Sequence, residues 1–355
     1  MIPESRPDSS VRTSDFDYHL TDELIAQTPM EPRDQSRLMV VPMSNGLVSH
    51  RHFYDLPDLL RKGDVLVFND SRVIPARLYG RRNGSDGKIE LLLLDRISDK
   101  VWRALVKPGR RMNLDADFTV TNRNGEAVVS GRVKEVEEAG TRIVEFSDPD
   151  GFRSAGVVPL PPYIHEKLDD PERYQTVYSR REGSVAAPTA GLHFTPELLS
   201  DIRSRGVETV FVTLHVGWDT FRPINTDDPS AHEMHSEAWE LSQEAADSIN
   251  QAKADGRRVI SVGTTAVRLL EHAALVNKSA DRVITAGSGR ANLFIQPGFD
   301  FKVVDALITN FHLPKSTLLM MVSALAGKDL VLRVYKEAVT ERYRFYSFGD
   351  AMFFC

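Results

Sequence analysis

Hydrophobic and polar residues alternate between about Val65 and Phe146 in a way that is typical of short β-strands. The apolar runs VLVF, VIPARL, IELLLL and VWRALV follow one another here, and turn formers such as Asn124 and Gly125 divide the later segments. About six short strands joined by glycine-rich turns predict a small barrel or sandwich.

From about Leu192 onward, strand-like runs alternate with helical ones. The expected elements are a helix ending near Gly206, a strand at 210–216, helices at 243–254 and 264–275 around a strand at 258–262, a strand at 303–309, and a helix at 317–326. Ser242 caps the second of these helices, while Gly256 and Gly327 end two of them. Strands that alternate with helices predict a layered α/β domain.

The run GSVAAPTAGLHFT at 183–195 fits neither a strand nor a helix interior, because Gly and Pro disrupt both. It predicts a loop that lets its backbone approach a ligand closely, shaped by Pro188, Gly191 and His193. Thr195 followed by Pro196 predicts a helix start with Thr as the N-cap, and a helix N-terminus favours an anionic group nearby. A buried connector without a ligand is the alternative.

Polar clusters follow four of the apolar strands. They are NDSR at 69–72, HVGWDTF at 215–221, GTT at 263–265 and TNFHLP at 309–314. In α/β sheets ligands bind outside the carboxyl ends of the strands, so these four loops are expected to converge on one pocket. Taken alone, Gly263-Thr264-Thr265 is equally compatible with a plain helix cap.

Five of the ten histidines lie in these motif loops, namely His193, His215, His232, His235 and His312. Histidine exchanges protons near neutral pH, so these residues could serve a proton-transfer reaction on a nucleoside-like substrate. They could instead ligate a metal, with His232 and His235 three residues apart and Glu237 close by, although no HExxH spacing is present.

Composition narrows the class. The chain has 355 residues, 41% of them hydrophobic and 26% charged, which is ordinary for a soluble enzyme of about two domains. Its single cysteine, Cys355, excludes an internal disulfide and a thiolate metal cluster. No run approaches the roughly 20 apolar residues that span a bilayer, and residues 1–14 lack the apolar core of a signal peptide. We therefore expect a disordered tail at 1–14, no membrane partner and a cytoplasmic location.

The net charge of −6 is unevenly distributed. Between Arg72 and Arg111 there are eleven Lys and Arg against four acids, or +7, which leaves −13 for the rest. A locally basic face on an acidic protein is typical of phosphate binding, and the segment KPGRR at 107–111 is the densest part. The alternative is a solvated face whose charges happen to share a sign.

Long segments of the chain match one protein family. They are FDYHLTDELIAQTP at 16–29, RDQSRLMV at 33–40, DVLVFNDSRVIPARL at 64–78, PLPPYI at 159–164, RYQTVYS at 173–179, GSVAAPTAGLHFT at 183–195, TLHVGWDTF at 213–221, HEMHSE at 232–237, VGTTAVRLLE at 262–271, FIQPGFDFKVVDALITNFHLPKSTLLMMVSALAG at 294–327 and YRFYSFGDAM at 343–352. On these segments the chain resembles the S-adenosylmethionine:tRNA ribosyltransferase-isomerases of queuosine biosynthesis. The resemblance covers nearly the whole chain, from about Phe16 to Met352.

The resemblance implies a transferase in which S-adenosylmethionine donates ribose instead of methyl. The ribosyl group is transferred and isomerised onto 7-aminomethyl-7-deazaguanine at the tRNA wobble position, giving epoxyqueuosine-tRNA with release of adenine and methionine. S-adenosylmethionine is then a co-substrate, and neither a metal nor a prosthetic group is called for. The implied fold is a discontinuous α/β domain at 15–70 and 156–355 with a β-barrel inserted at 71–155.

The implied chemistry begins with removal of the C5′ proton beside the sulfonium. We expect His193, His215 or His235 to be the base, or else Asp70, which could also steady the sulfonium charge. Adenine departure needs a proton donor or hydrogen bonds, for which we expect the residues Asn310, His312, Thr264 and Thr265. Arg72 and Arg268 are expected to hold the methionine carboxylate or a tRNA phosphate. Gly191, Thr195 and Gly263 complete the expected substrate site.

The tRNA partner follows from the charge distribution. The basic β domain is expected to bind the anticodon arm through Arg77, Lys107, Arg110 and Arg111, and the protein is expected to act as a monomer. The chain departs from the family pattern at Trp218 and Asp219, where small residues are usual, and these two side chains are expected to alter the shape of the loop that follows His215. A metal-dependent hydrolase acting on a nucleotide or RNA, and a non-catalytic RNA-binding protein, remain as alternatives.

Overall fold

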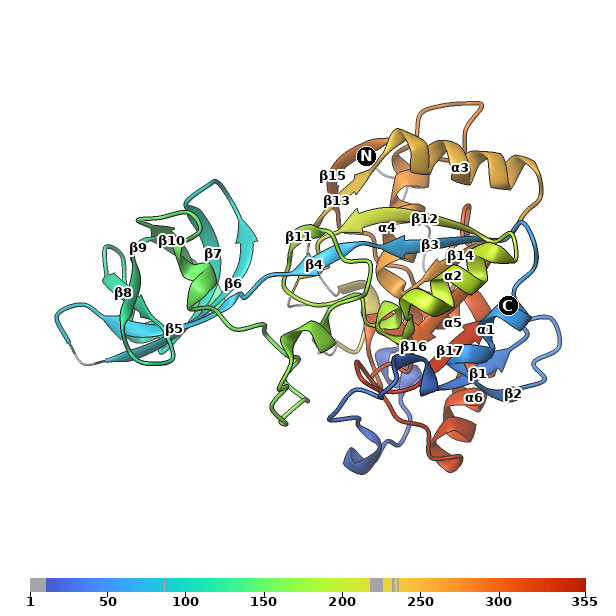
Figure 1. Cartoon of the computed structure of the whole chain (residues 1–355), viewed down its shortest axis with the longest axis horizontal. Coiled ribbons are helices and arrows are strands. Elements are labelled where there is room, and N and C mark those ends of the chain that lie inside the picture. Colours follow the sequence, from blue (N-terminus) through green and yellow to red (C-terminus); the bar gives the residue numbers. More distant parts are fainter. Residues whose placement is uncertain (1–10, 86, 218–225, 232–233, 235) are drawn as a thin grey trace. The chain divides into compact units, whose positions relative to one another are not determined.

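The computed structural model describes residues 11–85, 87–217, 226–231, 234 and 236–355. Its chain divides into two compact units. Unit 1 comprises residues up to Ser71 together with Pro161–Arg180 and Pro188–Cys355, and unit 2 comprises Arg72–Leu160 and Arg181–Ala187. The elements of both are labelled in Figure 1.

Unit 1 is built on a mixed nine-stranded sheet. In spatial order its strands are β15 (Gly287–Ala291), β13 (Glu237–Leu241), β12 (Glu208–Leu214), β3 (Val65–Asn69), β14 (Val259–Val262), β16 (Ala306–Asn310), β17 (Ala351–Phe354), β1 (Arg37–Val41) and β2 (Ser49–His52). The four central strands β12, β3, β14 and β16 run parallel to one another. All residues of β3, β14 and β16 are buried, as expected for strands covered on both faces.

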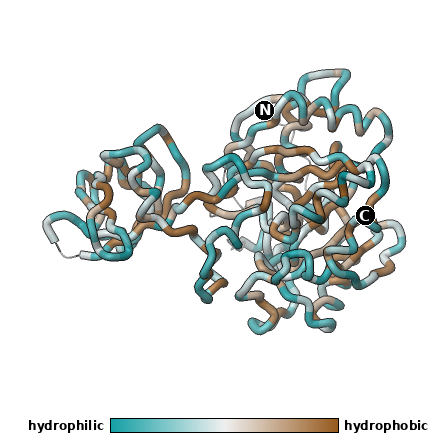
Figure 2. The backbone as a smooth tube through the Cα atoms, in the orientation of Figure 1, coloured by the Kyte–Doolittle hydropathy of each residue, from teal (hydrophilic) through white to brown (hydrophobic). Residues whose placement is uncertain are grey.

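Six α-helices accompany the sheet in the described part of the chain. They are α1 (Leu56–Leu59), α2 (Pro196–Ser204), α3 (Gln243–Ala254), α4 (Thr264–Val276), α5 (Thr317–Ala326) and α6 (Lys328–Thr340). Helix α2 buries Leu198 and Ile202 against the sheet face that carries Leu66, Phe68 and Ile308. Figure 2 shows the corresponding pattern, with hydrophobic central strands and more polar outer helices.

Most of the expected elements of unit 1 are confirmed. Helix α3 has the expected bounds and its Ser242 cap, and α5 has the expected bounds and ends at Gly327. The strand expected at 303–309 instead begins at Ala306. The reason is the buried Glu271 of α4, whose carboxylate accepts the main-chain N–H groups of Val303 and Val304 at 3.1 and 2.9 Å.

Unit 2 contains a closed six-stranded barrel. Its strands follow one another in the order β10 (Thr141–Phe146), β7 (Val101–Lys107), β6 (Lys88–Arg96), β5 (Arg77–Arg82), β8 (Asp117–Thr121) and β9 (Ala127–Val136). The interior is apolar, with Phe118, Phe146 and Phe152 buried. Beside the barrel, β4 (Ser71–Val73) pairs with β11 (Arg181–Ser184) in a separate two-stranded sheet. The predicted fold class, an α/β domain with a small inserted β-barrel, is confirmed.

No helix in the described ranges is long and apolar enough to cross a membrane.

Candidate functional site

The carboxyl ends of β12, β3, β14 and β16 meet along one edge of the large sheet, because these neighbouring strands are parallel. Residues at or just after these strand ends, together with His193 of the 3-10 helix η9 (Thr189–His193), form what we call the strand-edge site. It consists of Asn69, Asp70, His193, His215, Gly263, Thr264, Thr265 and Asn310. The four strand ends thus share one edge of the sheet, and their convergence on a single pocket stays a prediction.

Asn69 is the last residue of β3, Asp70 follows it, and both are buried. The Asn69 amide donates to the Leu214 carbonyl at 2.9 Å and to the Thr265 hydroxyl at 3.3 Å, so it joins the ends of three strands. The Asp70 carboxylate accepts from the Thr213 hydroxyl at 2.7 Å and from Arg180 Nη2 at 3.0 Å. Both of its oxygens are thus engaged, which suits an electrostatic role better than proton abstraction.

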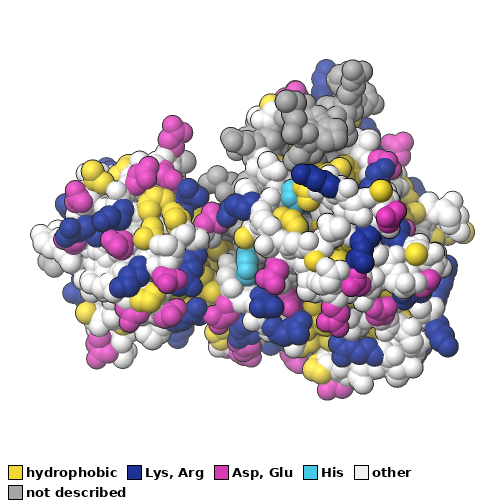
Figure 3. Space-filling model, turned by 90° about the horizontal axis from the view of Figure 1, so that it is seen from above, with side chains coloured by type: hydrophobic (Ala, Val, Ile, Leu, Met, Phe, Trp, Pro, Cys, Tyr) yellow, Lys and Arg dark blue, Asp and Glu magenta, His cyan; other side chains and the backbone are white. Residues whose placement is uncertain are grey.

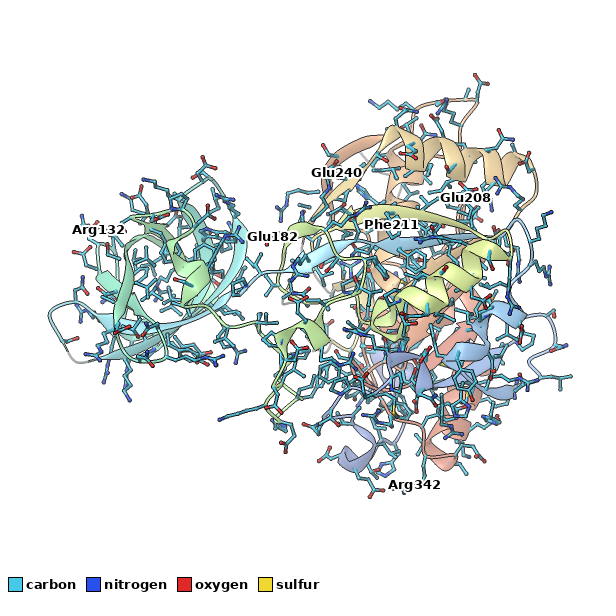
Figure 4. The ribbon with its side chains drawn as sticks, viewed as in Figure 1. Arg132, Glu182, Glu208, Phe211, Glu240 and Arg342 are labelled. Carbon is cyan, nitrogen blue, oxygen red and sulfur yellow. The ribbon has the colours of Figure 1, made fainter. Side chains whose placement is uncertain are left out.

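His215 follows β12, and its main-chain N–H donates to the Ala238 carbonyl at 2.9 Å. Its Nδ1 is buried and has no hydrogen-bond partner among the described residues. Burial lowers the pKa of His215, whereas the nearby carboxylates of Asp70 and Glu240 raise it again. Glu240 is labelled on β13 in Figure 4. His215 is therefore a mostly neutral imidazole with a ring nitrogen available to a ligand.

Gly263 stands between β14 and α4 with a φ of 89°, a conformation that glycine adopts without strain. Its N–H donates to the Ile308 carbonyl at 2.8 Å, which ties the loop to β16. No side chain caps the N-terminus of α4, and both Thr264 and Thr265 of its first turn are buried. The helix N-terminus therefore faces this edge of the sheet with its first N–H groups uncapped.

His193 and Asn310 contact each other directly, although they are 117 residues apart in the chain. Asn310 Nδ2 lies 3.1 Å from His193 Nε2 and donates to the Tyr346 carbonyl at 3.2 Å. His193 Nδ1 lies 2.7 Å from the Ser36 hydroxyl, and the ring stacks on Phe53 with centroids 4.9 Å apart.

The tautomer of His193 follows from these contacts. The Tyr346 carbonyl only accepts, so the nitrogen of the Asn310 amide must face it, and the same nitrogen then donates to His193 Nε2. His193 therefore carries its proton on Nδ1 and donates it to Ser36. Burial, followed by the charges of Arg344 and Arg33, lowers the pKa of His193 to about 3. With both nitrogens engaged, His193 is a poor proton acceptor.

Several other expected substrate residues have structural partners. Thr195 caps α2, accepting from the Leu198 N–H at 3.1 Å, as its position before Pro196 predicts. Gly191 allows a close approach, because a methyl group there would lie 2.0 Å from Tyr178 Oη. His312 Nε2 lies 2.8 Å from the Thr309 hydroxyl, and the His312 main-chain N–H donates to Tyr335 Oη at 3.0 Å.

Arg268 forms a buried ion pair on α4. Its Nη1 lies 2.5 Å from Glu237 Oε2, and each side chain is only 1% exposed. Glu237 Oε1 also accepts the Gly217 N–H at 2.9 Å. The charge of Arg268 is thus already matched by a carboxylate, so the guanidinium offers less to a substrate carboxylate than the sequence predicts.

The remaining predicted residues are in unit 2 or outside the described residues. Arg72 lies on β4, and Arg77 on β5 is 3.7 Å from Glu90. Lys107, Arg110 and Arg111 are exposed at the turn after β7, which includes the 3-10 helix η5 (Gly109–Arg111). His232, His235, Trp218 and Asp219 lie outside the described residues. Within the described ranges, no group of three or more His, Cys, Asp or Glu could hold a metal ion.

Sequence reasoning missed several residues that shape these sites. Arg180 pairs with Asp70, and Ser36 hydrogen-bonds to His193. Arg142 is buried and donates to the carbonyls of Met112 and Gly109 at 2.7 and 2.9 Å. Arg142 thereby holds the basic turn in place. An isolated polar residue carries no periodic signal, so no pattern in the sequence distinguishes these residues from ordinary surface positions.

Known proteins share this sequence over nearly its whole length. A family model described as queuosine biosynthesis protein matches residues 13–354. Proteins named S-adenosylmethionine:tRNA ribosyltransferase-isomerase from Symbiobacterium thermophilum and Moorella thermoacetica are each 53% identical, over 96% of this chain and 99% of theirs. A crystal structure of S-adenosylmethionine tRNA ribosyltransferase from Thermotoga maritima is 38% identical with a TM-score of 0.56, over 96% of this chain and 100% of that one. The chain therefore belongs to the queuosine biosynthesis protein family.

Proposed function

We propose that this protein is an S-adenosylmethionine:tRNA ribosyltransferase-isomerase. It transfers and isomerises the ribosyl group of S-adenosylmethionine onto 7-aminomethyl-7-deazaguanine in tRNA, and it releases adenine and methionine. The observation that carries this proposal is the match of a whole chain to relatives of that name, combined with a buried, polar strand-edge site of neutral histidines and amides.

The decisive experiment follows the release of adenine. Purified protein is incubated with S-adenosylmethionine and tRNA that carries the deazaguanine precursor, and free adenine is measured by chromatography. We expect free adenine to appear only when both substrates are present. Its amount should equal the amount of modified tRNA that is formed. Release of S-adenosylhomocysteine, or hydrolysis of RNA that a chelator abolishes, would contradict it.

Among the described histidines, His215 supports the role of C5′ base best. A base needs a free lone pair. Within the described part of the chain Nδ1 of His215 has no hydrogen-bond partner, whereas both nitrogens of His193 are engaged. Asp70 would favour the imidazolium that forms, since its carboxylate raises the pKa of His215. His193 then acts as a positioning residue that holds Asn310.

Asn310 supports a role as hydrogen-bond acceptor. Its two N–H groups are used by Tyr346 and His193, while its Oδ1 is buried and no described residue donates to it. An unpaired buried amide oxygen costs about 1–3 kcal/mol, so a ligand N–H donor placed there would be favoured. We assign it to the 6-amino group of adenine.

The Asn310 assignment predicts how the enzyme treats a purine analogue. Replacing the adenine of S-adenosylmethionine by purine without the 6-amino group should weaken binding to the wild type about 10-fold. Asn310→Leu should bind the natural substrate and the analogue about equally. If the variant discriminates between them as strongly as the wild type, Asn310 does not contact that amino group.

We also propose which part of the tRNA is bound and in which oligomeric state the protein acts. The exposed turn of Lys107, Arg110 and Arg111 supports binding of the anticodon arm, because exposed cations can reach phosphates. We propose that the protein acts as a monomer, which sedimentation of the free protein and of its tRNA complex would test. The cytoplasmic location stays a prediction.

A further inference from the structure

A pocket in unit 1 lies beside His193 and has a cavity volume of about 20 Å³. Its wall includes Arg33, Arg173, His193 and the segment Ser347–Gly349. Of the residues that line it, two carry a permanent charge, Arg33 and Arg173, and both are cations. We call this the arginine pocket.

Main-chain carbonyls hold both guanidinium groups in place. Arg33, in the 3-10 helix η3 (Arg33–Gln35), donates from Nη1 to the Leu192 carbonyl at 3.2 Å and from Nη2 to the Glu172 carbonyl at 3.0 Å. Arg173, in η8 (Pro171–Tyr174), donates from Nη2 to the Met30 carbonyl at 2.5 Å. Carbonyl oxygens orient a guanidinium without cancelling its charge, so the pocket keeps its positive character.

Glu31, which pairs with Arg173, does little to neutralise the charge of Arg33 and Arg173. Glu31 lies 2.9 Å from Arg173 Nη2, but its side chain is 75% exposed, and ion pairs in contact with water are weak. Burial lowers the pKa of Arg33 and the charge of Arg173 lowers it further, while the charges of Glu31, Asp170 and Glu172 act in the opposite direction without cancelling the shift. The two cations are therefore held partly out of water and repel each other, an arrangement that an anion would stabilise.

We propose that the arginine pocket binds an oxyanion, and that this oxyanion is the carboxylate of the methionine moiety of S-adenosylmethionine. The inference rests on the proposed function. Two guanidinium groups match the planar, two-oxygen geometry of a carboxylate. At about 20 Å³ the pocket has room for one small group and is far below the roughly 300–1,000 Å³ of sites that enclose a whole ligand, so it suits one end of a larger molecule.

The position of the arginine pocket is compatible with S-adenosylmethionine as the ligand. His193 lines the arginine pocket and contacts Asn310, which we assign to the adenine end of the same substrate. One molecule could thus place its carboxylate on the arginines and its nucleoside over the strand edge. Arg268, which the sequence suggested for this carboxylate, is paired with Glu237 instead. A tRNA phosphate is the other oxyanion that could occupy the pocket.

Calorimetric binding of two ligands to the full-length protein tests the assignment without requiring turnover. The ligands are S-adenosylmethionine and its decarboxylated form, in which hydrogen replaces the carboxylate. The wild type should bind the decarboxylated form about 10- to 100-fold more weakly. Arg173→Met and Arg33→Met should each lose affinity for S-adenosylmethionine and distinguish the two ligands less than 3-fold, with Arg33→Lys between them and the wild type. Arg342→Met, at an exposed position labelled in Figure 4, is the matched control and should behave as the wild type.

Three results would overturn the assignment. Equal binding of both ligands by the wild type would do so, as would wild-type discrimination in both Met variants. A raised Kd for tRNA with a flatter salt dependence, and an unchanged Kd for S-adenosylmethionine, would assign the pocket to a phosphate. Failure of the proposed function would be recognised separately. In that case the wild type would release no adenine, whatever the binding measurements show.

Discussion

At the scale of single residues, hydrogen-bond partners separate His193 from His215. His193 has both ring nitrogens engaged, and His215 has a buried nitrogen to which the structure gives no partner in the ranges it describes. We predict that His215→Ala lowers kcat for adenine release by about 100- to 10,000-fold, the usual contribution of general base catalysis. His193→Gln should mainly raise the KM for S-adenosylmethionine, because it disturbs Asn310. A larger loss of kcat in His193→Gln than in His215→Ala would reverse the assignment.

His312 makes a prediction about stability at low pH. Burial lowers its pKa to about 3 in the folded protein, against 6.5 as the ordinary value. Between these two values the unfolded chain binds a proton that the folded protein does not. The stabilising contribution is therefore complete above pH 6.5 and is lost as the pH falls from there toward 3, by about 1.4 kcal/mol per pH unit.

His312→Asn should remove that slope. We expect the free energy of unfolding in urea, measured at pH 7, 6 and 5, to fall less steeply for the variant than for the wild type. The exposed residue His52 provides the matched control, His52→Asn. An equal slope in the His312 variant and the wild type would show that His312 is already protonated in the folded protein.

At the scale of elements, helix α2 depends on the cap that precedes it. The Thr195 hydroxyl accepts the Leu198 N–H, and loss of such a cap costs about 1 kcal/mol. Thr195→Ala should therefore lower the free energy of unfolding by about that amount, and Thr195→Ser should keep most of it. A KM for S-adenosylmethionine that rises in the Ala variant but not in the Ser variant would give Thr195 the substrate-binding role that its sequence position suggested.

The elements also show what could be read from the sequence. Helices α3 and α5 follow from their caps and terminal glycines, and strands of the barrel follow from short apolar runs between turn formers, because these signals are local. The run VLVF at 65–68, expected in the same group of strands, lies instead in β3 of the nine-stranded sheet. Strand β16 was expected too early, since the N–H groups of Val303 and Val304 bind a side chain from α4. The loops of the strand-edge site could be predicted, because chain direction alone brings strand ends together. Arg33 could not, since the carbonyls that orient it are 139 and 159 residues away.

At the scale of the whole molecule, unit 2 differs from the rest of the chain in the sign of its net charge. Residues 72–160 hold 16 Lys and Arg against 13 acids, a net +3, which leaves −9 for the rest of the chain. Figure 3 shows both signs interspersed on the visible face of the barrel. The excess lies in the first half of this segment and includes the turn of Lys107, Arg110 and Arg111, which the buried Arg142 braces.

We predict that replacing Lys107, Arg110 and Arg111 together by Gln flattens the salt dependence of tRNA binding. Each lost phosphate contact should reduce the slope of log K against log salt by about 0.7–0.9. Arg132→Gln is the matched control on the same barrel, because Arg132 is already paired with Asp117 at 2.7 Å and is labelled in Figure 4. A slope that stays the same in the triple variant would place the tRNA elsewhere.

The small β4–β11 sheet sets a limit on how this protein can be recombined with its relatives. Strand β11 comes from Arg181–Ser184, far along the chain from the barrel, and the Ile74 N–H donates to the Ser184 carbonyl at 2.9 Å. In a chimera that takes only residues 72–160 from a relative, most of β4 would come from the relative and β11 from this protein, so the two strands of the small sheet would not match. An exchange that also includes residues 181–187 would keep both strands from the same protein.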